Sequence, residues 1–520
     1  MTKKTIPVVD LFAGPGGLGE GFSALDNGEA FQIIVSAEKD PIAHQTLRLR
    51  AFFRLLKTKM PEGLADYYAF CNGEAKLPFT ERTKKLWEDA GKEALCVVLG
   101  TEEGNEKLDA AIYQRLGQDT GNKPWILIGG PPCQAYSLVG RARNKGIADY
   151  RAETDHRNFL YKEYLRIINR YKPTMFVMEN VKGMLSATVG GGRIFHEILQ
   201  DLAIPARAFP SETDKPRYKI YSLVSDQHFE PDSDPTKIDA NAFIVKAEHY
   251  GIPQARHRVI LVGIREDFNE GKLGKLKPQP LIDVEDVIDA LPKLRSRLSK
   301  EPDSAVNWQR RVTKQVKSIA KEASKAGMKD LAAQLNKACG NLSKHSDYGG
   351  TRVLRDDKAS TGLPELDAWY KDDKVKFWLN HETRGHRIDD LGRYAFAAAF
   401  AELHKRSPKG HAEFNLTGLA PAHKNWESGK FSDRFRVQTR KGPSTTITSH
   451  ISKDGHYFIH YDPTQCRSLT VREAARLQTF PDNYFFQGGR TQQYHQVGNA
   501  VPPFLANQIA NVIYQSLTKP

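Results

Sequence analysis

The sequence feature that most constrains the fold is a short apolar run that ends in a rigid turn. Residues 125–128 (Trp-Ile-Leu-Ile) predict a buried strand, and the Gly-Gly-Pro-Pro turn at 129–132 cannot continue its hydrogen-bond ladder. Cys133 therefore follows the carboxyl end of a strand, where open α/β sheets bind their ligands. A lone cysteine is more often a small buried hydrophobe, but an exposed loop thiol can ionise and act as a nucleophile. The rigid turn favours the interpretation of Cys133 as a nucleophile.

A strand-to-helix junction near the start of the chain carries glycines in a pattern suited to a nucleotide. Gly14, Gly16 and Gly19 give the G-x-G-x-x-G spacing, which lets the backbone approach a ligand and leaves helix N–H groups free. The next apolar strand, 31–37, ends at Glu38, about 20 residues after the loop, where an acidic residue binds ribose hydroxyls. The glycines alone could be a tight structural turn. Together with Glu38 they predict a nucleoside site.

Two further strands carry polar residues at their ends. The apolar strand 175–178 runs into Glu179, and an isolated buried carboxyl is costly to ionise, so we expect Glu179 to hold a proton that it can donate. Arg256 and Arg258 lie beside the strand 259–263 and share one face of an extended segment. This geometry suits the binding of one planar anionic or carbonyl-bearing group. A basic surface patch is the alternative.

Composition limits the kinds of partner that the chain can have. Its 520 residues suffice for two or more domains, and the net charge of +14 favours an anionic partner. No run approaches the roughly 18 apolar residues of a membrane span, and the first residues do not resemble a signal peptide. The five cysteines are scattered without metal-ligand spacing, which is typical of a reducing compartment. We therefore expect a cytoplasmic protein with no membrane partner and no metal.

The chain changes character about half-way along. Residues 293–317 carry eight basic residues against two acidic ones, and residues 312–338 predict a polar helix. Periodicity is poor in 340–440, and we interpret 266–440 as mainly a second domain. The polar, mixed residues 57–94 predict only an insertion.

The C-terminal part is regular again. Thr470 and Glu473 form a capping box, which predicts a short helix ending before Pro481. After the segment 498–503, apolar residues recur at helical spacing from 505 to 513 and predict a final helix.

A group of polar residues near position 385 could suggest a metal or nuclease site. His381, Arg384, His386 and Asp389 are close in sequence, but their spacing matches no established ligand pattern. We therefore predict that they make hydrogen bonds or phosphate contacts instead.

Taken in order, these blocks resemble those of the bacterial DNA (cytosine-5)-methyltransferases of restriction–modification systems. The matching segments are DLFAGPGG at 10–17, GPPCQAYS at 130–137, ENV at 179–181, QARHR at 254–258, RSLTVREAARLQTFP at 467–481 and GNAVPP at 498–503. They resemble, respectively, the family's cofactor loop, catalytic loop, acid motif, arginine motif and two C-terminal motifs. The resemblance spans residues 10–265 and about 430–515, with the middle covered only by position.

The resemblance implies an architecture and a set of partners. The fold class would be α/β, with a discontinuous Rossmann-like class I methyltransferase domain (1–280 and 465–520) whose sheet is mixed and mostly parallel, and a smaller target-recognition domain (281–464). The C-terminal helix would pack back on the first domain. The cofactor would be S-adenosyl-L-methionine and the substrate double-stranded DNA. The protein would be a monomer, with a restriction endonuclease as a possible functional partner.

The resemblance also implies a mechanism that agrees with the residue chemistry. The Cys133 thiolate would add to C6 of a cytosine flipped out of the duplex, which makes C5 nucleophilic enough to be methylated. Glu179 would protonate ring N3, and Arg258, assisted by Arg256, would hold the base and the catalytic loop. Loss of the C5 proton would then release Cys133.

By the same resemblance, two groups of residues would bind the cofactor and the DNA. The cofactor contacts would be Phe12, Gly14, Gly16, Gly17, Glu38, Pro131, Asn499, Ala500 and Val501. The DNA contacts would be Gln134, Ser137, Arg141, Arg143, Gln254, Arg434 and Arg436. The sequence departs from the family in two places. Gly100 and Thr101 stand where relatives carry an acidic adenine contact, so we assign none, and Lys39 stands where some relatives have an aromatic residue.

Three other functions compete with this interpretation. An RNA (cytosine-5)-methyltransferase would use the same motifs, but such relatives have little sequence in the region of the recognition segment. A non-catalytic DNA-binding relative would not need Cys133, Glu179 and Arg258, which are all present. A nicotinamide-dependent oxidoreductase would explain the glycine loop and none of the other blocks.

Overall fold

A sheet of nine strands lies at the centre of the part of the chain that the structure describes. The computed structural model describes residues 5–132, 156–189, 192–209, 215–268, 273–356, 360–421, 426 and 434–518. Its strand order is β3-β2-β1-β4-β5-β12-β8-β9, with β10 paired to β12. The strands are β1 (Ile6–Leu11), β2 (Phe31–Glu38), β3 (Ala94–Cys96), β4 (Ile126–Gly129), β5 (Met175–Val181), β8 (Tyr218–Tyr221), β9 (His228–Phe229), β10 (Ile244–Lys246) and β12 (His257–Arg265).

The sheet is mixed and mostly parallel, which confirms the predicted α/β fold class. Strands β3, β2, β1, β4 and β5 run parallel, so their carboxyl ends share one edge. Strand β12 runs antiparallel between β5 and β8 and therefore begins at that same edge. The strands predicted from the apolar runs 31–37, 125–128, 175–178 and 259–263 are present as β2, β4, β5 and β12.

Helices cover both faces of the sheet because successive residues of a strand point to opposite sides. On β1, Val8 faces the core that includes helix α1 (Gly17–Ala24) and the C-terminal helix α17 (Pro503–Thr518). Val9 faces the opposite core, which includes α5 (Glu102–Leu116), α7 (His156–Tyr171) and α8 (Ile194–Ala203).

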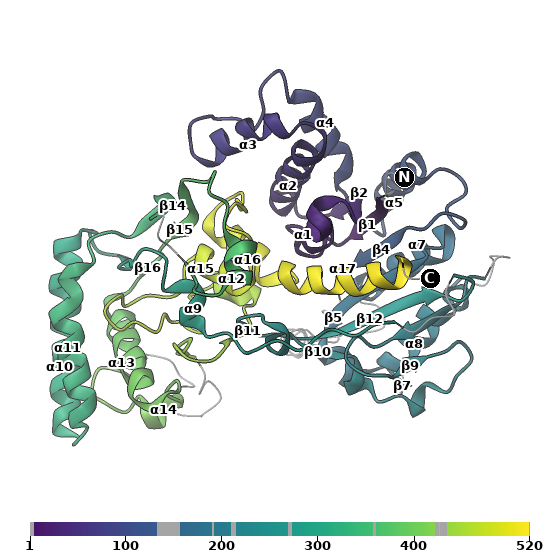
Figure 1. The fold of residues 1–520 in the computed structure, drawn as a ribbon. Helices are drawn as coiled ribbons and strands as arrows, with labels where there is room; N and C mark the ends of the chain where they lie inside the picture. Colours follow the sequence, from purple (N-terminus) through teal and green to yellow (C-terminus); the bar gives the residue numbers. More distant parts are fainter. Residues whose placement is uncertain are drawn as a thin grey trace.

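The C-terminal helix lies against the first helix, as predicted (Figure 1). A Cβ at Gly21 of α1 would come within 2.4 Å of the Ala506 Cβ of α17, so only glycine permits this approach. The Asn507 amide donates to the Gly21 carbonyl at 2.9 Å. The C-terminal helix α17 therefore completes the hydrophobic core that covers α1 on this face of the sheet.

The segment 57–94 forms helices that reach across to the second half of the chain. Helix α2 (Pro41–Lys59) leads into α3 (Leu64–Cys71) and α4 (Lys84–Glu93), at the top of Figure 1. These helices share a hydrophobic core with the hairpin of β14 (Gly349–Leu354) and β15 (Phe377–Glu382). The Arg352 guanidinium donates to the carbonyls of Phe70 at 2.8 Å and Cys71 at 2.6 Å, which ties the hairpin to α3.

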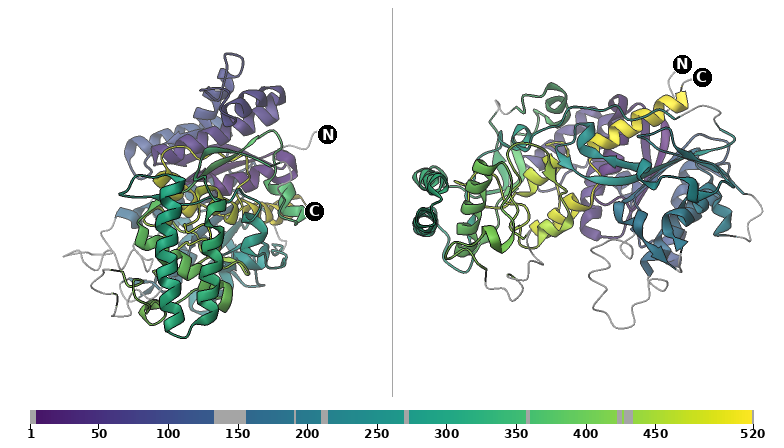
Figure 2. Two further views of the ribbon diagram at one scale, coloured as in Figure 1. Left: turned by 90° about the vertical axis from the view of Figure 1, so that its left-hand side faces the viewer. Right: turned by 90° about the horizontal axis from the view of Figure 1, so that it is seen from below.

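A two-helix hairpin replaces the single helix predicted for residues 312–338. Helix α10 (Ala305–Lys325) and helix α11 (Lys329–Asn341) lie side by side, as the left view of Figure 2 shows. The chain reverses at Gly327, whose φ of +79° favours glycine. The prediction missed both the break and the buried face of α10, which includes Trp308 and Val312.

The remaining described α-helices and strands lie outside the central sheet. They are β6 (Thr188–Val189), β7 (Gly192–Arg193), α9 (Val284–Ile288), β11 (Gln254–Ala255), β13 (Arg297–Leu298), α12 (Pro364–Tyr370), β16 (Gly385–His386), α13 (Ile388–His404), α14 (Gly410–Glu413), β17 (Ser444–Thr445), α15 (Val471–Leu477) and α16 (Arg490–Asn499). The capping box of α15 is confirmed: the Thr470 amide donates to the Glu473 carboxylate at 2.8 Å, and the Glu473 amide donates to Thr470 Oγ1 at 3.2 Å.

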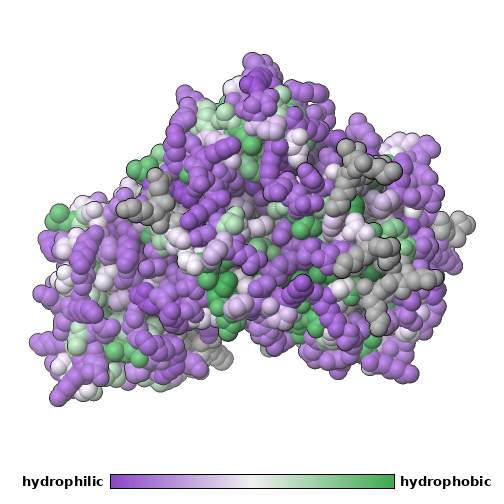
Figure 3. Space-filling model, viewed as in Figure 1, coloured by the Kyte–Doolittle hydropathy of each residue, from purple (hydrophilic) through white to green (hydrophobic). Residues whose placement is uncertain are grey.

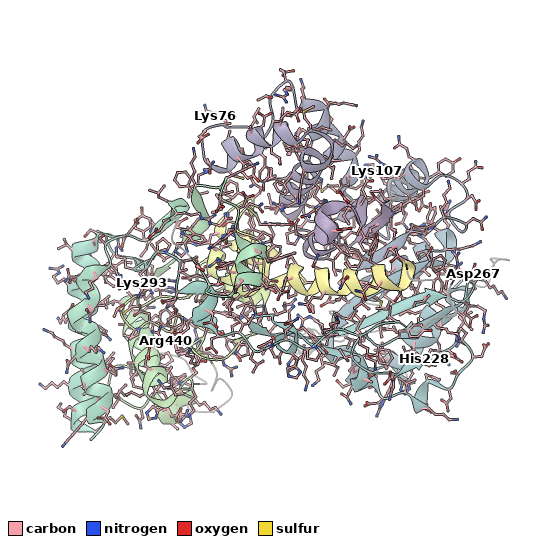
Figure 4. All side chains as sticks on the ribbon, viewed as in Figure 1. Lys76, Lys107, His228, Asp267, Lys293 and Arg440 are labelled. Carbon is pink, nitrogen blue, oxygen red and sulfur yellow. The ribbon has the colours of Figure 1, made fainter. Side chains whose placement is uncertain are left out.

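Most of the visible surface is hydrophilic, and ion pairs link elements of the second half of the chain. Figure 3 shows hydrophilic residues over most of the visible face, with apolar residues in small groups. Arg440, labelled in Figure 4, pairs with Glu285 of α9 at 3.2 Å and Glu402 of α13 at 2.8 Å. No helix within the described ranges is both long and apolar enough to cross a membrane.

Candidate functional site

A cleft of about 520 Å³ opens at the carboxyl edge of the parallel strands. Its walls include residues 12–15 after β1, residues 37–40 at the end of β2, residues 130–132 after β4 and residues 179–181 of β5. Arg258, at the start of β12, and Arg256, just before it, also line the cleft, as do Thr448, Ser449, Gln492, His495, Gln496 and residues 498–501. The cleft therefore brings together five of the six sequence blocks.

The glycine loop has a backbone that most residues could not adopt. Gly14 and Gly16 have φ values of +57° and +97°, in the left-handed region that favours glycine. The Glu38 carboxylate accepts hydrogen bonds from the amides of Gly14 and Asp40, each at 2.8 Å. Glu38 thus fixes the loop to the turn between β2 and α2, while its carboxylate still lines the cleft.

The start of helix α1 touches the turn that follows helix α16. A Cβ at Gly17 would lie 2.3 Å from the Val501 carbonyl oxygen and 3.3 Å from the Ala500 Cβ. Only glycine therefore lets the two segments meet, and both Ala500 and Val501 line the cleft. Asn499, the last residue of α16, lines it as well and is exposed.

Glu179 is ion-paired, which corrects the expectation of an isolated buried carboxyl. Arg258 Nε lies 2.8 Å from Glu179 Oε1, and the two side chains are 17% and 14% exposed. The sheet register creates this pair, because Arg258 lies opposite Val181 and Ile260 lies opposite Glu179 on antiparallel strands. A guanidinium on the adjacent strand thus compensates the carboxylate and orients it at the wall of the cleft.

Arg256 lines the cleft together with Arg258, and its guanidinium also bonds to backbone carbonyls of later segments, so its role in holding the base stays a prediction. Its guanidinium donates to the carbonyls of Ile447 at 3.0 Å and Gly498 at 3.4 Å. Burial, with a smaller effect of Arg258, holds the pKa of Arg256 well below its ordinary value. Arg256 therefore fixes two later segments of the chain at the cleft.

Gln254 is fully buried, which corrects its predicted role as a DNA contact. Its amide nitrogen donates to the Leu477 carbonyl at 3.2 Å and to Gln478 Oε1 at 3.1 Å. Its amide oxygen accepts from the Ile447 amide at 2.7 Å. These bonds engage both ends of the amide and join β11 to the segment that includes β17.

The acid motif is bonded to the proline turn that precedes Cys133. The Asn180 amide donates to the Pro131 carbonyl at 3.2 Å, and a Cβ at Gly130 would lie 3.1 Å from Glu179 Oε2. The end of β5 and the turn after β4 are therefore in direct contact. Five predicted residues of the catalytic loop lie outside the described residues: Cys133, Gln134, Ser137, Arg141 and Arg143.

The two other predicted DNA contacts lie away from the cleft. Arg434 is 4.0 Å from the Asp454 carboxylate, and the Arg436 guanidinium lies 4.8 Å from the centre of the Tyr457 ring. Within the described residues, neither arginine lines the cleft. Both remain predicted DNA contacts.

The residues near position 385 make hydrogen bonds, as predicted. His381 bonds Thr470 Oγ1 and the Pro292 carbonyl, each at 2.9 Å, and burial lowers its pKa to about 4. Arg384 donates to the carbonyls of Ile451 and Lys453, and His386 bonds Ser468 Oγ at 3.2 Å. These side chains hold the second half of the chain to the C-terminal motif.

Several cleft residues were not predicted from the sequence. Among them, Thr448, Ser449, Gln492 and His495 come from segments near the C-terminal motif. The available signal was Gly498, because a Cβ there would lie 2.3 Å from the Ser449 amide nitrogen and the Thr448 carbonyl carbon. Such a glycine marks the passage of another backbone segment, although it does not identify which one.

Comparisons with known proteins agree with this geometry. The family model for C-5 cytosine-specific DNA methylases matches residues 109–204 and 239–515. Type II methyltransferase M.Bpa9945I of Bacillus paralicheniformis is 31% identical, over 97% of this chain and 98% of that protein. DNA (cytosine-5-)-methyltransferase M.ApeKI of Aeropyrum pernix is 26% identical, over 75% of this chain and 81% of its own length. A crystal structure of a prophage-encoded DNA modification methyltransferase from E. coli has the same fold, with a TM-score of 0.52, 18% identity, and coverage of 99% of this chain and 100% of that chain.

Proposed function

The chain belongs to the C-5 cytosine-specific DNA methylase family, and we propose that it transfers a methyl group from S-adenosyl-L-methionine to C5 of a cytosine in double-stranded DNA. The observation that carries the proposal is the meeting, in one cleft, of the glycine loop, the turn before Cys133 and the Glu179–Arg258 pair. A cofactor, a nucleophile and an acid are what this chemistry requires side by side.

The described residues fit S-adenosyl-L-methionine. Of the nine predicted cofactor residues, all of them described, seven line the cleft: Phe12, Gly14, Glu38, Pro131, Asn499, Ala500 and Val501. The other two, Gly16 and Gly17, form the turn that lets the loop approach Val501. When bound, the cofactor supplies an electrophilic methyl group. Two carboxyls at the floor and rim, Asp10 and Glu38, suit a ligand that carries positive charge and hydroxyl donors.

Residues of the chain itself would prepare the cytosine. The Cys133 thiolate adds to C6 of a base that has left the duplex stack, which raises the electron density at C5. The Glu179 carboxylate, oriented by Arg258, would take up a proton from solvent when the base enters and share it with ring N3 in the adduct. Loss of the C5 proton then expels the sulfur and restores the ring. Arg256 has a positioning role, because it holds residues 447 and 498 at the cleft.

The second half of the chain would read the DNA. We assign 281–464 to target recognition and the discontinuous unit 1–280 and 465–520 to catalysis. The excess of basic residues supports a polyanionic substrate, and Arg434 and Arg436 would contribute DNA contacts together with Gln134, Ser137, Arg141 and Arg143. The type II methyltransferase names of the relatives support a role in restriction–modification, in which a cognate endonuclease would cut unmodified sites. We expect the protein to act as a monomer.

A methyl-transfer assay with two nucleic acids tests this function. Purified protein and tritiated S-adenosyl-L-methionine are incubated with duplex DNA or with transfer RNA, and bisulfite sequencing locates the product. We expect 5-methylcytosine at a defined site in duplex DNA, and no product with Cys133→Ser. Methylation of the RNA and not the DNA, or of neither, would contradict the proposal.

A further inference from the structure

Asp10 of β1 is a carboxyl that lies at the cleft without a side-chain partner. It is 1% exposed and lines the cleft near the carboxyl end of β1. No side chain among the described residues bonds to its carboxyl oxygens, and the one backbone group close enough to affect its pKa is the Gly19 amide of α1. Buried carboxyls without partners are rare because the charged form loses its hydration, so each one requires an explanation.

The neighbour of Asp10 in the sheet is also a buried polar side chain. Ser36 of β2 lies opposite Asp10 in the β1–β2 register, and its hydroxyl is also buried without a partner within the described ranges. Gly19 of α1 leaves room above the carboxyl, because a Cβ there would lie 2.9 Å from Asp10 Oδ2. Two adjacent buried polar groups thus lie at this point of the sheet, and Asp10 is the one that lines the cleft.

Among the described residues, no cation is paired with Asp10. The titratable groups that interact with it electrostatically are Arg54 of α2, Glu38 of β2, Glu93 of α4, Tyr164 of α7 and Tyr484. Arg54 is the single cation among these groups, and it is ion-paired with Glu93 and lies 4.0 Å from Glu20. Burial therefore prevails over the attraction of Arg54 and raises the pKa of Asp10 to about 8.

We propose that Asp10 binds the ammonium group at the methionyl end of the cofactor and releases its proton to solvent when that cation enters. The inference rests on the proposed function, since it assigns a residue to the cofactor of that function. An ammonium supplies both the donors and the positive charge that the buried carboxyl lacks. The exchange balances, because one proton leaves the carboxyl as one cation arrives beside the carboxylate.

Calorimetry of the unmodified chain tests the proton release without any turnover. S-adenosylhomocysteine, which carries the same ammonium, is titrated into the protein at pH 7 in two buffers that differ in ionisation enthalpy. A carboxyl with a pKa near 8 is mostly protonated at pH 7, so we expect release of up to ~0.9 proton per ligand bound. The affinity should rise roughly ninefold between pH 6 and pH 7, a range in which the ligand's own ammonium stays protonated.

Variants and a truncated ligand assign the proton to Asp10. Asp10→Asn should abolish the proton release and flatten the pH dependence, whereas Glu29→Gln, at an exposed site, should change neither. Methylthioadenosine, which lacks the amino-acid end, should release no proton from the unmodified chain. It should also bind Asp10→Asn and the unmodified chain equally well.

Each outcome has a separate meaning. Tight binding of S-adenosylhomocysteine without proton release would overturn the inference, as would equal release by methylthioadenosine or by Asp10→Asn. Failure of the unmodified chain to bind S-adenosylhomocysteine at any pH would instead contradict the proposed function. If Asp10→Asn does not fold, the proton counts for the two ligands on the unmodified chain decide the question.

Discussion

Removal of the Arg258 guanidinium tests whether the ion pair at the cleft organises catalysis. In Arg258→Ala, the Glu179 carboxylate loses a partner at 2.8 Å and remains only 14% exposed. Two unit charges about 4 Å apart attract by ~4 kcal/mol at an effective dielectric constant of about 20. Desolvation cancels much of this attraction, so we expect the free energy of unfolding to fall by about 1–3 kcal/mol. The carboxylate also loses its orientation, and we expect methyl transfer to slow by about 10²–10³-fold.

Arg265→Ala is the matched control, because Arg265 lies at the opposite end of the same strand. Its guanidinium pairs with Asp267 at 2.6 Å and donates to the carbonyls of Lys172 and Gly121. This variant should lose comparable stability while each folded molecule keeps its rate.

Two measurements separate the effects on folding and on catalysis. Urea unfolding gives the stability of each variant, and single-turnover transfer of a tritiated methyl group to duplex DNA gives the rate per folded molecule. A normal rate in Arg258→Ala would refute the reasoning, because Glu179 would then need no cation beside it. Equal slowing in Arg265→Ala would also refute it, since the effect would then follow from weakened folding.

Three other predictions concern the cofactor loop, the buried core and pH. Gly17→Ala places a methyl group 2.3 Å from the Val501 carbonyl, so it should weaken S-adenosylhomocysteine binding at least ~10-fold by calorimetry; unchanged affinity would contradict the contact. Glu473→Gln breaks the buried pair with Arg467, at 2.6 Å, and should lower the free energy of unfolding by about 3–5 kcal/mol in urea; a loss below about 1 kcal/mol would show that the pair contributes little. The pKa of Asp10, about 8 when folded against about 3.9 when unfolded, means that the folded chain holds the extra proton between these values. Stability without ligand should therefore fall by about 1.4 kcal/mol per pH unit across this range relative to Asp10→Asn, and parallel curves for the two proteins would contradict the assignment.

Local sequence patterns correctly predicted the helices and strands that are determined by neighbouring residues. The strand before Glu179 is a continuous apolar run, and the capping box of Thr470 and Glu473 is complete within four residues, so both could be found without the fold. The pair of helices at 312–338 was missed because apolar periodicity continues across the break. Gly327 was its single marker.

The helices of the insertion at 57–94 could not be predicted for a different reason. Its helices are stabilised by the β14–β15 hairpin, which is distant in sequence: Arg352 bonds carbonyls 281 and 282 positions away. Tertiary contacts of this kind override weak local propensities.

The candidate site likewise contains features that the sequence predicts and features that depend on contacts between distant segments. The order of the strands in an α/β sheet places the glycine loop, the proline turn and the acid motif at one edge, and sequence reasoning used that rule. It could not show that residue 447 passes behind the arginine motif, 191 positions from Arg256. Gln254 therefore resembled a ligand contact, although it holds the chain together. The partner of Glu179 was also hidden, because only the antiparallel register of β12 reveals it.

The most direct test of the central claim is to trap the bond between Cys133 and a cytosine. The unmodified chain is incubated with S-adenosyl-L-methionine and a duplex that carries 5-fluorocytosine at the target position, whose fluorine cannot leave as the C5 proton does. Mass spectrometry of the digested complex should find the nucleotide on the peptide that contains Cys133, and Cys133→Ser should yield no adduct. A chain that methylates ordinary duplex DNA but forms no adduct, or forms one on another residue, would contradict the account.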